Sequence, residues 1–230
     1  MERVFFPFDA ELKNELDQIK LAIQGEQNGI AARSMGQMAY KKNYGVPYTS
    51  LRKIANQYPP NKKLAKCLWN IGYRETMLIA LLLFPIEEVE KEEACSLVAD
   101  MQELELVEFA CRDMLCKLPY ANELVPVCAE SEGKYTMETA YLLAARLLEN
   151  DTTVPSFSDS LCSKVEMDLS KCRPTLAKAV SNYLKQLGIF DSQNAKVVAI
   201  VDKLSSSDNM QFRWVAEEVR TFVEYTEHKA

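Results

Sequence analysis

Residues 176–187 read LAKAVSNYLKQL, and the spacing of apolar side chains in this segment indicates the fold class of the chain. Its apolar side chains recur every three or four residues, so they lie along one face of a helix. No segment alternates with a period of two for long enough to predict a strand. The chain is therefore predicted to be all-α. Five further segments repeat the helical spacing, with apolar positions at Leu12, Leu16, Ile19 and Ile23; Leu51, Ile54, Ala55 and Tyr58; Leu64, Cys67, Leu68 and Ile71; Val107, Ala110, Cys111, Met114, Leu115 and Leu118; and Phe212, Val215, Ala216, Val219, Phe222 and Val223.

Short breaks separate these segments and indicate how the helices are arranged. Roughly ten to thirteen helices of about 10–17 residues are predicted between the breaks. One of them, over 73–84, is apolar nearly all round and is expected to lie between neighbours. Many short helices joined by tight turns favour an α-α superhelix, a curved solenoid of antiparallel pairs, with a compact bundle as the alternative. We interpret 150–160 as a loop and predict one domain over 1–230.

Composition argues against several classes of function. The 230 residues are 48% hydrophobic and 26% charged, as in an ordinary globular protein. The single histidine, His228, argues against most zinc sites and His-based acid–base catalysis, and no metal or organic cofactor is predicted. The seven cysteines are not spaced as in a disulfide-bonded framework, and the N-terminus lacks a signal-peptide pattern. The longest apolar run, 77–85, is too short for a membrane span, so we expect a cytoplasmic protein with no membrane partner.

Charge is distributed unevenly along a chain whose net charge is −6. Between Gln27 and Arg74 there is no acidic residue, whereas 75–132 holds fourteen acids and three basic residues. A basic block with interleaved tyrosines is typical of proteins that follow a phosphate backbone. The alternatives are a solvated positive face, or a face that docks against the acidic half. The basic block consists of Arg33, Lys41, Lys42, Arg52, Lys53, Lys62, Lys63, Lys66 and Arg74, with Tyr40, Tyr44, Tyr48 and Tyr58 among them.

The same part of the chain resembles a known family. The segments Asn43-Tyr44-Gly45-Val46-Pro47, Leu51-Arg52-Lys53-Ile54-Ala55 and Leu64-Ala65-Lys66-Cys67-Leu68-Trp69, followed by Arg74-Glu75 and Ala80-Leu81-Leu82, are similar to the N-terminal repeat of the AlkD-type DNA alkylation repair proteins. The resemblance implies a curved stack of HEAT-like helix pairs with a basic groove for double-stranded DNA. In active members it implies a DNA glycosylase that excises cationic N3- or N7-alkylated purines while contacting mainly the backbone around the lesion.

The resemblance also implies where a catalytic carboxylate would lie. Loss of an alkylated base leaves positive charge on the deoxyribose, which a nearby carboxylate stabilises. The family's Trp-Asp-x-x-Asp segment corresponds to 104–108 here, with Leu104 at the Trp and Glu108 at the catalytic Asp. The family's Arg falls near Glu138, and its later Trp near Asn182 or Tyr183. Glu108 also precedes Arg112 by four residues, the spacing of a helix-surface ion pair, which is the alternative interpretation.

We therefore predict a DNA-binding protein of the alkylation repair family, with Glu108 as the candidate catalytic residue. Tyr40 and Tyr44 are the candidate base or sugar contacts. The alternatives are a non-catalytic DNA-binding member, and a helical scaffold that holds a protein partner through the acidic segment 87–108. The predicted phosphate contacts are Lys41, Lys42, Arg52, Lys53, Lys62, Lys63, Lys66 and Arg74.

Overall fold

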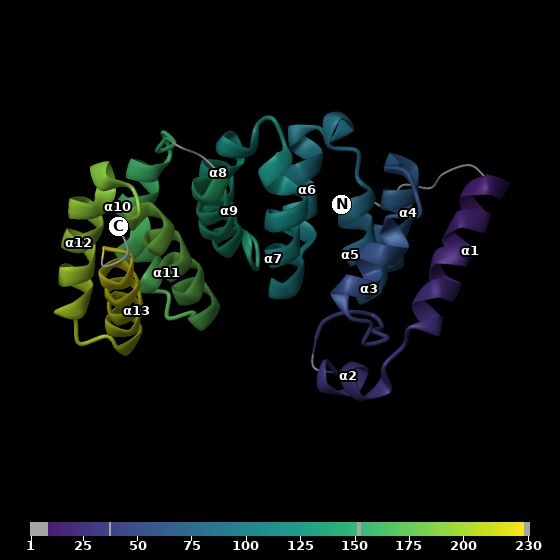
Figure 1. Cartoon of the computed structure of the whole chain (residues 1–230), viewed down its shortest axis with the longest axis horizontal. Helices are drawn as coiled ribbons and strands as arrows, with labels where there is room; N and C mark the ends of the chain where they lie inside the picture. The colour runs from purple at the N-terminus through teal and green to yellow at the C-terminus, as the bar shows by residue number, and fades with distance from the viewer. Residues whose placement is uncertain (1–8, 37, 151–152, 228–230) are drawn as a thin grey trace. The chain divides into compact units, whose positions relative to one another are not determined.

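The structure of the chain, a computed structural model, describes residues 9–36, 38–150 and 153–227, and His228 lies outside them. Thirteen α-helices and two short 3₁₀ helices are present in the described residues (Figure 1). The one β-type pairing in these ranges is an isolated bridge between Lys42 and Tyr73. The prediction of an all-α fold is confirmed.

The chain divides into two compact units, Met1–Pro119 and Tyr120–Ala230. The segment 150–160 therefore lies inside the second unit, where it links two helices. That the whole chain acts as one domain stays a prediction. Unit 1 contains α1 (Ala10–Gly25), α2 (Gly29–Ser34), α3 (Tyr48–Ala55), α4 (Lys62–Ile71), α5 (Arg74–Leu83), η1 (Ile86–Glu88), α6 (Lys91–Asp100), α7 (Leu104–Asp113) and η2 (Leu115–Lys117). Unit 2 contains α8 (Ala121–Glu130), α9 (Thr136–Asn150), α10 (Ser158–Leu169), α11 (Pro174–Gly188), α12 (Asp191–Ser205) and α13 (Met210–Glu227).

Within each unit, helices pack as stacked hairpins. In unit 1, α4 pairs with α5, and α5 also packs against α3 and α7. In unit 2, α8 pairs with α9 and α12 with α13, while α11 packs against both α9 and α13. Sequential pairs that stack on their neighbours are the construction of a helical repeat protein.

The apolar helix α5 confirms the expectation for 73–84. It begins at Arg74 and ends at Leu83, directly before Phe84-Pro85. Leu78, Ile79, Ala80, Leu81 and Leu83 are all buried. Because α3, α4 and α7 pack around it, α5 has almost no face that must be polar.

The segment 107–118 departs from the single three-turn helix that its pattern predicts. Helix α7 ends at Asp113, and Met114 has φ −130° and ψ −65°, outside the helical region. A 3₁₀ turn follows over Leu115–Lys117. Met114, Leu115 and Leu118 are nevertheless buried. The spacing identified the buried side chains correctly, but the backbone changes direction without leaving the core.

All seven cysteines are free thiols. Among the described residues, no helix combines the length and apolar character that crossing a bilayer requires.

Candidate nucleic-acid interface

Two lysines of the predicted phosphate-binding set are engaged by the acidic half of unit 1. Glu93 on α6 receives Lys62 Nζ at 2.9 Å and Lys66 Nζ at 2.7 Å, and Lys62 also donates to the Glu88 carbonyl at 2.6 Å. Burial alone would raise the pKa of Glu93, but hydrogen bonds from Lys66 and Lys62 hold it below its ordinary value. Lys62 and Lys66 therefore dock against the acidic part of the chain, which is one of the alternatives that the sequence left open.

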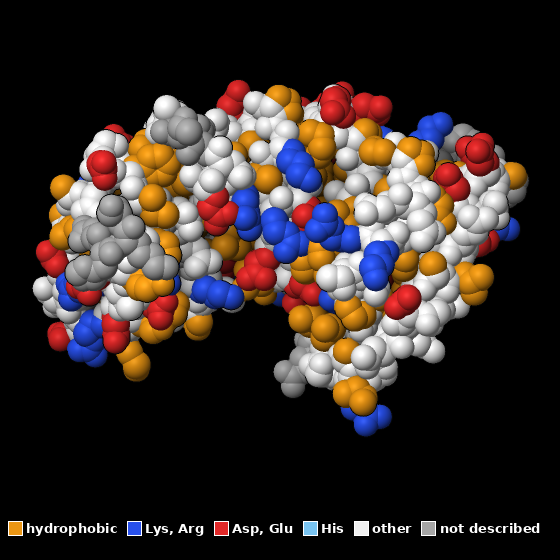
Figure 2. Space-filling view, viewed as in Figure 1, with side chains coloured by type: hydrophobic (Ala, Val, Ile, Leu, Met, Phe, Trp, Pro, Cys, Tyr) orange, Lys and Arg blue, Asp and Glu red, His pale blue; other side chains and the backbone are white. Residues whose placement is uncertain are grey.

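Five other members of the predicted set are exposed: Lys41, Lys42, Arg52, Lys53 and Lys63. Within the described part of the chain, Arg52, Lys53 and Lys63 take part in no ion pair. The first two lie on α3 and Lys63 lies in the first turn of α4. Figure 2 shows Lys and Arg side chains gathered on one face of the molecule over the part of the view that α5 and α7 occupy, with carboxylates between them.

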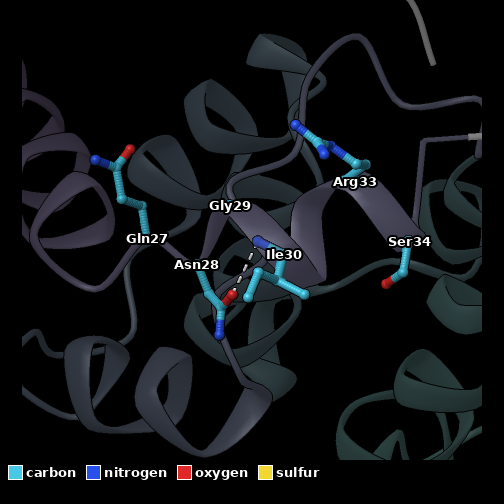
Figure 3. Close-up of a pocket in the computed structure, with 6 residues that line it drawn as sticks. All are labelled: Gln27, Asn28, Gly29, Ile30, Arg33 and Ser34. Atoms are coloured by element: carbon cyan, nitrogen blue, oxygen red, sulfur yellow. Dashed lines mark hydrogen bonds between the residues drawn. The ribbon is translucent and has the colours of Figure 1, made fainter.

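Arg33, the first basic residue of the block, borders an open hollow of about 700 Å³ along α2. Gln27, Asn28, Ile30 and Ser34 line the same hollow (Figure 3). Its polar wall thus consists of a guanidinium, two amides and a hydroxyl, without a carboxylate.

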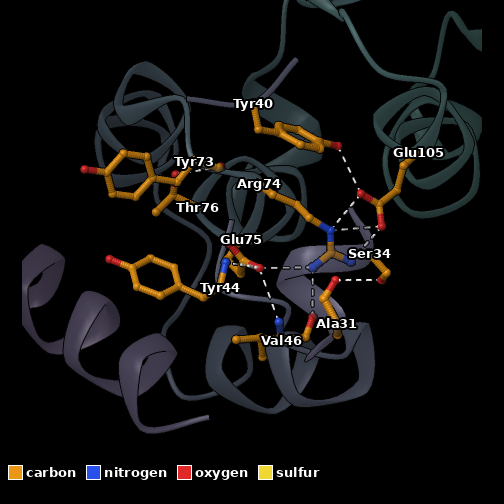
Figure 4. Close-up of polar contacts among 10 residues, drawn as sticks. All are labelled: Ala31, Ser34, Tyr40, Tyr44, Val46, Tyr73, Arg74, Glu75, Thr76 and Glu105. Carbon is orange, nitrogen blue, oxygen red and sulfur yellow. Dashed lines mark hydrogen bonds and ion pairs between the residues drawn. The ribbon is translucent and has the colours of Figure 1, made fainter. Parts of the chain in front are cut away.

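Arg74 has a different environment from the one predicted for a phosphate contact. It is only 3% exposed, and its guanidinium is held by protein groups (Figure 4). Nη2 lies 2.6 Å and Nε 2.8 Å from the two oxygens of Glu105, the two-point geometry that suits an arginine and a carboxylate. Nη1 donates to Glu75 Oε1 at 3.1 Å and to the Val46 carbonyl at 2.9 Å. The structure therefore corrects this assignment: Arg74 joins α5, α7 and the loop before α3, and all three of its guanidinium nitrogens already donate to protein groups.

Glu75 completes this buried cluster. It is fully buried, and its Oε1 accepts the backbone N–H groups of Tyr44 at 3.1 Å and Val46 at 3.3 Å. Burial alone would lower the pKa of Arg74, but hydrogen bonds and charge from Glu105 and Glu75 raise it. Arg74 thus stays charged between two carboxylates, and this ion cluster sets the path of the loop that carries Tyr44.

The two tyrosines predicted to touch a base or sugar are both half-buried. Tyr40 donates its hydroxyl to Glu105 Oε2 at 3.0 Å, and burial together with the Glu105 charge raises its pKa. The ring of Tyr44 lies 4.3 Å from Lys42 Nζ and meets Tyr73 edge-on at 6.2 Å. A hydrogen bond with Lys42 lowers the pKa of Tyr44. Tyr40 therefore supports the Arg74 cluster, whereas Tyr44 presents an aromatic face beside an exposed cation.

Glu108 is exposed on α7, one turn after Glu105 and one turn before Arg112. Its neighbour Phe109 stacks on Tyr48 of α3, with ring centroids 3.9 Å apart. The Arg112 guanidinium lies 4.6 Å from the Phe109 centroid and 4.8 Å from the Tyr48 centroid. These nearly equal distances place it at the side of the stacked pair. One stretch of α7 therefore carries a carboxylate, the Phe109 ring and a guanidinium, and the Tyr48 ring of α3 packs against it.

Asp113 holds this aromatic pair in position. It accepts the Tyr48 hydroxyl at 2.8 Å and two bonds from Arg112, at 3.0 and 2.8 Å. Our sequence analysis assigned no role to Phe109, Asp113 or Glu105. The one signal that could have found them is their own spacing of four residues, which places Glu105, Phe109 and Asp113 along one stripe of a helix.

Two of the unit 2 positions that the family resemblance singles out, Glu138 and Tyr183, are buried. Glu138 is fully buried and accepts Arg173 Nη2 at 2.6 Å and the Thr175 hydroxyl at 2.7 Å. Tyr183 is also fully buried and donates to the Ser158 carbonyl at 3.1 Å. Arg146, the nearest arginine in sequence to the position of the family's Arg, is half-buried and pairs with Glu149, one turn along the same helix.

Comparisons with known proteins identify the fold and the family to consider. A family model described as "DNA alkylation repair enzyme" matches residues 21–203. A solved structure described as "A new family of proteins related to the HEAT-like repeat DNA glycosylases with affinity for branched DNA structures" aligns with a TM-score of 0.75 at 16% identity, over 92% of this chain and 94% of that one. No curated protein matches the chain. At 16% identity the structural similarity is evidence for the fold alone, and it confirms the predicted HEAT-like repeat arrangement.

Proposed function

The chain belongs to the DNA alkylation repair enzyme family, and from that premise we propose that it binds double-stranded DNA through the exposed basic side chains of unit 1. The observation that carries the proposal is the exposure of Arg52, Lys53 and Lys63 without any ion pair in the described part of the chain. Unpaired surface cations gain most from a polyanion, because binding releases the counterions condensed on it.

Reversing Arg52, Lys53 and Lys63 to glutamate is expected to weaken duplex binding roughly 100-fold at low ionic strength. The plot of log affinity against log salt concentration should also become shallower by about 2.7, or about 0.9 for each lost phosphate contact. Fluorescence anisotropy with a labelled duplex at several salt concentrations measures both quantities. The three side chains are exposed, so the variant should keep its helix content.

A matched control tests whether position or total charge decides the result. Reversing Lys196, Lys203 and Arg220 in unit 2 changes the net charge by the same amount, and each of these residues already pairs with an acid. We expect a much smaller loss of affinity. Equal losses in the two triple variants would show that bulk charge, and not the three side chains on α3 and α4, drives binding.

The preferred DNA shape is the next part of the proposal. The structurally similar protein belongs to a family described as having affinity for branched DNA. We extend that preference to this chain, so that a four-way junction binds more tightly than a linear duplex of the same length and composition. Competition between the two DNAs for one labelled probe measures the ratio.

A second candidate activity is excision of a cationic alkylated purine with Glu108 as the catalytic carboxylate. The observation that favours it is the exposed position of Glu108 on α7, directly before Phe109, whose ring stacks on Tyr48. A carboxylate stabilises the positive charge that develops on the sugar, and aromatic rings attract a cationic base. The rings here come from Tyr48 and Phe109, since Leu104 stands at the family's tryptophan position.

Glu108→Gln tests this activity because it removes the negative charge and keeps the shape. Single-turnover release of N7-methylguanine from duplex DNA should fall roughly 100-fold or more in the variant, while duplex affinity stays unchanged. Release at the wild-type rate by Glu108→Gln would exclude Glu108 as the catalytic group. No release by saturating wild-type protein would leave DNA binding as the function of the chain.

A further inference from the structure

Helix α2 has no buried side chain, and polar contacts hold it in place. It has six residues, and Asn28 caps it by accepting the N–H groups of Ile30 and Ala31, each at 3.1 Å. Ile30 is 87% exposed. One exposed apolar residue is ordinary on a protein surface. A helix that buries nothing and presents an isoleucine to solvent is less ordinary, because such a short helix has little stability of its own.

The loop that carries Tyr44 holds α2 in place. Asn28 donates its N–H to the Tyr44 carbonyl at 2.8 Å. Gly45 has φ +69°, and a Cβ built there would lie 2.3 Å from the Asn28 carbonyl oxygen and 2.4 Å from the Ala32 nitrogen. Only glycine permits so close an approach of the two backbones. The contact joins α2 to the loop that bears Lys42 and that the Arg74 cluster positions.

The surroundings of α2 suit a polyanion. Arg33 is exposed one turn after Ile30, beside the open hollow of about 700 Å³ (Figure 3). No acidic residue occurs anywhere between Gln27 and Arg74 in the sequence. In Figures 1 and 2, α2 forms a projection of unit 1 on which hydrophobic and basic side chains lie together. An apolar tip next to a cation is a combination that DNA-bending proteins use when a side chain enters between base pairs.

We propose that α2 is a wedge for branched DNA: Ile30 enters an unstacked base step at the branch point while Arg33 contacts the adjacent phosphate. The proposal rests on the proposed function, since it presumes DNA on this face of unit 1. Opening a base step in a regular duplex costs free energy, whereas a branch point is already partly unstacked. Ile30 therefore adds affinity for branched DNA and little affinity for linear duplex.

Ile30→Ala tests the wedge directly. We expect about a tenfold loss of affinity for a four-way junction, as removal of most of a buried isoleucine side chain predicts, and less than a twofold loss for linear duplex. Alanine favours helix and Ile30 is exposed, so folding should be preserved. Leu21→Ala is the matched control, because Leu21 is 70% exposed on α1, and it should change neither affinity.

A second readout follows the base instead of the affinity. With 2-aminopurine at the branch point, binding of the wild-type protein should raise the fluorescence, because unstacking relieves quenching, and Ile30→Ala should not raise it. The wedge would be overturned if Ile30→Ala kept the wild-type affinities and the wild-type fluorescence change. It would also be overturned if Ile30→Ala lost affinity equally for the junction and for the linear duplex. Both of these results leave the proposed function standing, whereas failure of the wild-type protein to bind any DNA would remove both.

Discussion

Replacement of Arg74 with methionine is expected to destabilise unit 1 by about 3–5 kcal/mol. The reason is that Glu75, fully buried, and Glu105, mostly buried, would lose the guanidinium that pairs with both of them. An uncompensated buried charge loses far more free energy than a broken surface pair. Equilibrium unfolding in urea, followed by circular dichroism, measures the change in the free energy of unfolding.

Two further variants separate charge from position. Arg52→Met removes an exposed arginine from the same unit and should change the free energy of unfolding by less than about 0.5 kcal/mol while weakening DNA binding. Arg74→Lys keeps the charge but loses the two-point contact with Glu105, so its loss should be intermediate. If Arg74→Met were as stable as Arg52→Met, the structural assignment of Arg74 would be wrong and a phosphate contact would again be available to it.

Gly45→Ala is expected to release α2 from the loop. The new Cβ would overlap backbone atoms of Asn28 and Ala32, which cannot rotate away as a side-chain end can. Because α2 buries no side chain, separating it from the loop is the least costly relief. The amide of Ala32 should therefore lose its protection from hydrogen exchange, and junction affinity should fall at least as far as in Ile30→Ala. The free energy of unfolding should fall by about 1–3 kcal/mol.

Gly72→Ala is the matched control for backbone strain. Gly72 has φ +73°, close to that of Gly45, but a Cβ at this position would meet only the flexible Lys41 side chain, at 3.1–3.2 Å. This variant should lose about 1 kcal/mol from strain and keep the amide protection of α2. Equal behaviour of the two variants would mean that the close approach at Gly45 does not anchor α2.

Local patterns in the sequence were sufficient to predict the fold class. The spacing at 176–187 lies within α11, and the apolar run at 73–84 corresponds to α5. Such patterns succeed because a helix places residues three and four apart on the same face. All the residues that form the face therefore lie within one short segment of sequence. The same reasoning identified the buried residues of 107–118 but missed the end of α7 at Asp113, where tertiary packing permits a change of backbone direction.

The candidate site depended on contacts that no single segment contains. The order of residues is enough to identify the basic block and the absence of acids within it, and the family resemblance pointed to Glu108. The folded chain was needed to find that Arg74 pairs with Glu105, that Lys66 pairs with Glu93, and that Tyr48 stacks on Phe109. A count of charges gives the total along a segment, but whether a cation faces solvent or a carboxylate depends on which helices stack, and that is a property of the folded chain.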